Sequence, residues 1–154
     1  MWTETKSALL SNTRRSFWRS FSRKAEEAIP FMQGASIRKV DAVSKSAGQT
    51  GLSWAFAVNR YEAWAELTIS LSGDKERSHN VFNSLYAHKA DIEAKYGGRL
   101  LWDKKDSRKM CNVKSLPRED HGMEDQDRWN ELQDKLTDKM YRLERSLSPY
   151  FQSI

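Results

Sequence analysis

Four side chains in this sequence carry thiol or imidazole groups that could ligate a metal or take part in nucleophilic catalysis: Cys111, His79, His88 and His121. A zinc site needs four converging ligands, which short spacings such as CxxC or HExxH usually supply. Neither spacing occurs here. Cys111 falls in a predicted strand, where a buried and unreactive thiol is the common case. We therefore predict no metal, no cofactor and no cysteine nucleophile.

An ExK sequence, Glu93-Ala94-Lys95, is the pattern that a restriction-type nuclease would require. Such enzymes place it on a strand, where carboxylates hold Mg²⁺ and the lysine orients water. Here it lies inside a predicted helix that ends at Gly97-Gly98, so Glu93 and Lys95 point in different directions. The GK[ST] ending of a phosphate-binding loop and the GxSxG turn of hydrolases are also absent. We expect a protein that is not an enzyme.

Basic and aromatic side chains form the remaining pattern. Basic groups can neutralise phosphates, and aromatic rings can stack on bases. Three arginines recur every fourth residue in the first predicted helix, and the others lie at two predicted hairpins. The tentative nucleic-acid contacts are Arg15, Arg19, Arg23, Arg60, Trp64, Lys104 and Lys105. DNA or RNA is thus the expected partner, while the alternative is that the arginines form a solvated helix face and the tryptophans belong to the core.

The elements that position these residues follow from apolar periodicity. Strands are predicted at about 53–59, 62–71, 99–103 and 110–116, and helices at about 5–28, 74–96 and 124–147. The stretch 32–51 is rich in Ser, Gly, Lys and Ala and is predicted to be mostly loop. The order α-ββ-α-ββ-α predicts a single α+β domain over residues 1–154. It has two layers, a four-stranded antiparallel sheet and helices packed on one of its faces.

These predicted layers leave one sheet face uncovered, and Trp64 lies on it together with Glu62, Glu66, Thr68 and Ser70. A tryptophan on such a face is either exposed or in contact with another chain. The alternative function is therefore a protein-interaction or dimerisation module that uses the sheet face around Trp64.

The composition fits these expectations. The length of 154 residues suits one domain, and six tryptophans supply apolar bulk for a core. A net charge of +5 permits binding to nucleic acid without requiring it. A single cysteine excludes an intrachain disulfide and favours a reducing compartment. No signal peptide or long apolar run is visible, so we expect a cytoplasmic protein that does not enter a membrane.

Two segments carry a family resemblance. They are the strand Ala65-Glu66-Leu67-Thr68-Ile69 and the stretch from Ile92-Glu93 to Trp102, which includes Tyr96-Gly97-Gly98-Arg99. The chain resembles the bacterial family called domain of unknown function 4268, whose members often follow a restriction-like nuclease module. The resemblance implies an accessory role in nucleic-acid processing or bacterial defence, with a nuclease as a further expected partner. It transfers no catalytic residue to this chain.

Overall fold

The computed structural model describes residues 2–34, 36–39 and 42–154, and the side chains of residues 12–34, 43–152 and 154. The helices are α1 (Trp2–Ala28), α2 (Lys75–Tyr86), α3 (Lys89–Tyr96) and α4 (Trp129–Leu147), with 3-10 turns η1 (Pro30–Met32), η2 (Gln126–Arg128) and η3 (Ser148–Ser153). The strands are β1 (Ser36–Lys39), β2 (Ala42–Ser46), β3 (Leu52–Val58), β4 (Ala63–Ile69), β5 (Leu100–Asp103) and β6 (Cys111–Ser115).

In the described part of the chain, six strands form one antiparallel sheet in the order β1-β2-β3-β4-β6-β5. The α+β class and the antiparallel sheet are confirmed, but the predicted four strands and the order α-ββ-α-ββ-α are wrong. The stretch predicted as loop, 32–51, contains β1 and β2. These strands lie at the edge of the sheet, are only four and five residues long and are rich in Ser and Lys. They therefore lack the apolar alternation that identifies a strand.

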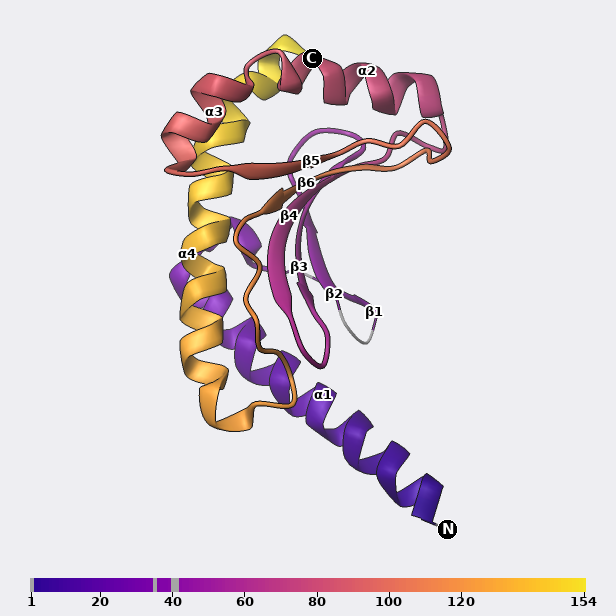
Figure 1. The fold of residues 1–154 in the computed structure, drawn as a ribbon, viewed down its shortest axis with the longest axis vertical. Helices are drawn as coiled ribbons and strands as arrows, with labels where there is room; N and C mark the ends of the chain where they lie inside the picture. Colours follow the sequence, from indigo (N-terminus) through magenta and orange to yellow (C-terminus); the bar gives the residue numbers. More distant parts are fainter. Residues whose placement is uncertain (1, 35, 40–41) are drawn as a thin grey trace.

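One face of the sheet carries the core. The register places Trp54 opposite Leu67, Leu67 opposite Val113, and Val113 opposite Trp102, so one row of apolar side chains crosses four strands. Phe56 lies on the same face, and its ring centroid is 4.6 Å from that of Phe21 in α1. Figure 1 shows α4 running along one side of the curved strands and α1 crossing near their lower end. Burial of these large side chains is the main force that joins the layers.

The predicted helix 74–96 is two helices. Its start is as expected, because the Asp74 side chain accepts a hydrogen bond from the Arg77 backbone N–H at 3.1 Å. Its end is also as expected, because Gly97 caps it with a φ of +93°. Between them the chain turns at Ala87 and His88. The turn lets α2 pack on β4 and β6 while α3 packs on α4, which one straight helix could not do.

The last helix begins later than the predicted 124–147. α4 starts at Trp129, and its indole Nε1 donates a hydrogen bond to the Met123 carbonyl at 3.1 Å. This bond folds the preceding segment, including η2, back against the first turn of the helix. α4 then buries an apolar stripe against α1, α3 and the sheet.

Candidate functional site

The arginines of α1 form a line on its outer surface. Phe17 and Phe21 are buried, and they turn the opposite face of the helix toward solvent. That face carries Arg15, Arg19 and Arg23, all exposed, which we call the arginine stripe. Among the described side chains, none of the three has an ion pair. Like charges four residues apart on a helix repel one another, so the stripe concentrates positive charge up to Glu27, an exposed acid at the next position of the same spacing.

The turn between β3 and β4 lies beside α1. An open groove of about 900 Å³ is lined by Arg14 of α1 and by the turn residues Asn59, Arg60, Tyr61 and Glu62. Val58 and Met123 complete its lining. The structure therefore brings Arg60 close to the helix that carries the arginine stripe.

Arg60 is not a free cation. Its Nε lies 2.7 Å from Oε1 of Glu124, and this hydrogen bond raises the pKa of Arg60. The guanidinium carbon also lies 5.3 Å from the centroid of the Tyr61 ring. Tyr61 itself is 64% exposed. Sequence reasoning did not select Tyr61 as a contact, because an aromatic residue after a turn gives no signal of whether it faces water or the core.

Lys104 and Lys105 lie apart from the other candidates. Figure 1 shows the connection between β5 and β6 beside α2, at the opposite end of the sheet from the β3–β4 turn. Lys104 Nζ is 3.0 Å from Oδ1 of Asn83 and 5.9 Å from the centroid of the Phe82 ring, while Lys105 is exposed. The structure thus does not place these lysines on one surface with the arginine stripe.

Trp64 is half-buried by its own chain. Its Nε1 donates a hydrogen bond to Oε1 of Glu66 at 2.9 Å. Two cations lie over its ring, with Arg118 Cζ 4.8 Å and Lys114 Nζ 5.4 Å from the centroid. The expectation that Trp64 is exposed unless another chain covers it is therefore wrong. Side chains of β6 and of the segment after it cover the ring.

Glu66 is the centre of a polar cluster on this sheet face. Its side chain is only 9% exposed and accepts hydrogen bonds from Trp64, from Thr68 at 3.0 Å and from Asn112. Three donors offset the cost of burying a carboxylate. Asn112 was missed by sequence reasoning, because only the pairing of β4 with β6 brings it opposite Thr68.

A second carboxylate of this face is ion-paired, unlike Glu66, whose partners are neutral donors. Asp103 lies 3.0 Å from Arg108 and 3.5 Å from Lys114. Burial alone would raise the pKa of Asp103, but the hydrogen bonds and charges of the two cations together hold it below its usual range. Asp103 is therefore matched by two cations, while Glu66 is stabilised by neutral donors.

The cysteine and the histidines, which could ligate a metal or act in catalysis, lie in separate structural environments. Cys111 is buried, and burial raises the pKa of its thiol. The histidines contact different partners: His79 Nε2 is 2.8 Å from the Arg108 carbonyl, His88 stacks on Tyr150, and His121 Nδ1 is 3.1 Å from Asp120. No group of three potential metal ligands occurs among the described residues.

Glu93 lies in a helix, as predicted, and has a structural contact there. Its carboxylate accepts hydrogen bonds from the Leu100 backbone N–H at 2.8 Å and from Trp102 Nε1 at 3.3 Å. These two bonds fix the start of β5 against α3. Glu93 of the ExK sequence therefore orients a strand, while Lys95 Nζ lies 5.0 Å from the centroid of the Tyr150 ring.

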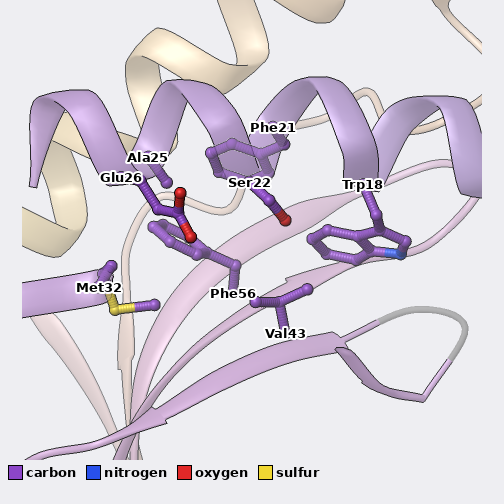
Figure 2. A pocket seen from close by; sticks show the side chains of 8 residues that line it. All are labelled: Trp18, Phe21, Ser22, Ala25, Glu26, Met32, Val43 and Phe56. Atoms are coloured by element: carbon purple, nitrogen blue, oxygen red, sulfur yellow. The ribbon is translucent and has the colours of Figure 1, made fainter. Parts of the chain in front are cut away.

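A small apolar cavity lies between α1 and the sheet (Figure 2). Its volume is about 10 Å³, room for about one water molecule, and Ser22 and Glu26 are the polar side chains that line it. Figure 2 shows the α1 side chains pointing toward Val43 and Phe56 on the strands below. The rest of the lining is Trp18, Phe21, Ala25 and Met32. The cavity is a gap in the packing and lacks the converging polar groups typical of a ligand site.

Comparison with known families matches most of the chain to one family. Residues 13–151 match the family described as Domain of unknown function (DUF4268). The chain belongs to the DUF4268 family. The matched region of this DUF4268 domain runs from near the middle of α1 into η3, so it includes the arginine stripe, the groove and the Glu66 cluster. No curated protein and no solved structure matches the chain.

Within the described residues, no helix of this DUF4268 chain is both long enough and apolar enough to cross a membrane.

Proposed function

We propose that this DUF4268 domain is a non-catalytic nucleic-acid-binding module that contacts its ligand through the arginine stripe. The observation that carries the proposal is the line of three exposed arginines, none of which has an ion pair among the described side chains. A role in nucleic-acid processing, in a restriction-like or defence setting with a nuclease partner, is part of this proposal and is supported by the family resemblance.

The stripe has the geometry to follow a phosphate backbone. Residues four apart on a helix rise by about 6 Å along its axis, so the three guanidinium groups extend over about 12 Å. Each arginine that neutralises a phosphate releases counterions, and this release drives binding at low salt. Of the acids that follow the stripe, Glu26 lines the cavity beside α1 and Glu27 is exposed one helical step beyond Arg23, so the basic surface ends at the last turn of the helix.

The test compares salt dependence in two variants with equal charge. The stripe variant replaces its three arginines with glutamine. The control variant makes the same change at Lys75, Arg77 and Arg99, which are exposed on other elements. Affinity for a labelled duplex and for a single strand is measured by anisotropy between about 50 and about 200 mM salt.

We expect the stripe variant to lose at least about tenfold in affinity at low salt. Its slope of log affinity against log salt should fall by about 2 to 3, because each lost phosphate contact removes about 0.9. The control should keep the wild-type slope to within about one contact. Absence of wild-type binding at low salt, or equal losses in the two variants, would refute the proposal.

The alternative, a protein-interaction or dimerisation module at the sheet face around Trp64, has weaker support. The Trp64 ring is already in contact with Lys114 and Arg118 of the same chain, and its Nε1 donates a hydrogen bond to Glu66. A partner would first have to displace these contacts, which costs free energy before any interface forms.

A further inference from the structure

The groove beside the β3–β4 turn has three properties that would allow it to bind an unpaired base. It is open, with a volume of about 900 Å³. The turn that lines it presents the aromatic ring of Tyr61, which is 64% exposed. It also includes Arg14, for which the described side chains supply no ion pair. An aromatic ring beside a free cation is the combination that binds single strands, because the ring stacks on a base and the cation meets a phosphate.

The turn holds Tyr61 in place through backbone hydrogen bonds. Oδ1 of Asn59 accepts bonds from the N–H groups of Tyr61 at 2.9 Å and Glu62 at 2.8 Å. The Asn59 carbonyl accepts a bond from the Met123 N–H at 3.0 Å, which ties the turn to the segment before α4. A platform that is already fixed loses little conformational entropy when a ligand stacks on it.

The charges of the groove favour an anion. Its two neighbouring acids are neutralised, since Glu124 pairs with Arg60 and Glu62 lies 3.4 Å from Arg118. Arg14 has no ion pair among the described side chains, and it precedes Arg15, the first arginine of the stripe, in α1. A strand whose phosphates follow the stripe would therefore reach the groove next.

We propose that the groove selects single-stranded over duplex nucleic acid by stacking one unpaired base on Tyr61, with an adjacent phosphate at Arg14. This inference rests on the proposed function and adds the class of ligand. Duplex bases are stacked on one another, so they cannot cover a protein ring in this way, whereas the unstacked bases of a single strand can.

The experiment uses the full chain and three substitutions. Tyr61→Leu removes the aromatic face, Tyr61→Phe keeps it, and Tyr141→Leu is the matched control. Tyr141 is also well exposed, at 47%, and also has an arginine over its ring, with Arg145 Cζ 5.4 Å from the centroid. The probes are a labelled pyrimidine strand of roughly 15 nucleotides, as DNA and as RNA, the matching DNA duplex, and poly-glutamate.

We expect the wild-type chain to bind either single strand about tenfold more tightly than the duplex, as one stacked base can provide. Tyr61→Leu should remove that preference and leave duplex affinity within about twofold, while Tyr61→Phe and Tyr141→Leu keep it. Because Tyr61 is exposed, its substitution should not unfold the chain, and a thermal melt checks this.

Three results would overturn the inference. One is equal wild-type affinity for strand and duplex, and another is the same loss in Tyr61→Leu and Tyr141→Leu. The third is poly-glutamate binding as tight as strand binding. In each case a salt slope that depends on the stripe would leave the proposed function standing. Absence of all wild-type binding would refute the function as well.

Discussion

Gly122 shows how closely the segment before α4 is packed against the β3–β4 turn. A Cβ atom added at this position would lie 2.1 Å from the Asn59 carbonyl oxygen and 2.9 Å from the Arg60 carbonyl carbon. Both atoms are backbone, so they cannot rotate away as a side chain could. The absence of a side chain at Gly122 is therefore what allows the turn with Tyr61 to be held by Met123.

We predict that Gly122→Ala destabilises the fold by about 2 kcal/mol or more, because the backbone must shift to remove the overlap. Gly98→Ala is the matched control, since a Cβ there meets no atom within 4 Å. Urea unfolding measures both. A loss in the control as large as that at Gly122 would show that close packing is not the cause.

Tyr96 supplies a pH-dependent contribution to stability. Burial raises its pKa to about 12, although nearby Arg142 acts in the opposite direction. The unfolded chain has a tyrosine pKa of about 10, so the folded state holds this proton more tightly. A raised pKa in the folded state means that the stabilisation is complete below about pH 10 and is lost as pH rises toward 12.

We therefore predict that the free energy of unfolding falls by up to about 1.4 kcal/mol per pH unit through this window because of Tyr96. Tyr96→Phe should lack that component, since other tyrosines and the lysines titrate alike in both proteins. The measurement is the difference between the two unfolding free energies at several pH values. A difference that stays constant from pH 9 to 11.5 would contradict the prediction.

The surroundings of some residues can be predicted from the sequence, and those of others cannot. The exposure of Arg15, Arg19 and Arg23 follows from helical spacing, because their periodicity opposes that of the buried aromatic residues. The contacts of Trp64 do not follow, because Lys114 and Arg118 come from β6 and the segment after it. Their distance from Trp64 depends on a strand register that no local pattern encodes.

At the scale of elements, α1 and the edge of the sheet leave a gap in their packing. The cavity in Figure 2 lies at this contact, with Val43 of β2 on its strand side. The sequence predicts α1 well, because a long periodic helix carries its own signal. It does not predict β2, whose only strong apolar residue is Val43. β2 forms because its backbone pairs with β1 and β3, which is a tertiary cause.

We predict that Val43→Ile stabilises the protein by about 0.8 kcal/mol, because one added methylene fills part of the cavity. Val113→Ile is the control, since Val113 is fully buried and does not line this cavity. At Val113 the extra methylene should lower the free energy of unfolding by about 1 kcal/mol or more, because the core there would be overpacked. Thermal and urea unfolding measure both, and equal effects of the two changes would contradict this account of the cavity.

The molecule as a whole separates its charges by face. On the sheet face around Glu66, neutral donors satisfy Glu66 and two cations pair with Asp103, whereas Arg15, Arg19 and Arg23 on the outer face of α1 have no ion pair among the described side chains. The α+β class and the antiparallel sheet could be predicted from the apolar periodicity, but the charge separation could not. It depends on which acids the fold brings to each cation, as with Arg60 and Glu124, which are 64 residues apart.

This separation predicts a conflict between stability and binding at α1. Arg19→Glu replaces repulsion from Arg15 and Arg23 with two attractive pairs at helical spacing, so the free energy of unfolding should rise by about 0.5 to 1 kcal/mol. The same change should weaken nucleic-acid binding by at least about tenfold, because it removes one phosphate contact and adds a repulsive charge. Arg99→Glu, with equal charge change outside the helix, should alter neither by as much. Opposite signs for stability and affinity are expected of a surface kept for a ligand. If Arg19→Glu lowered both, the arginine would instead belong to the contacts that hold the fold together.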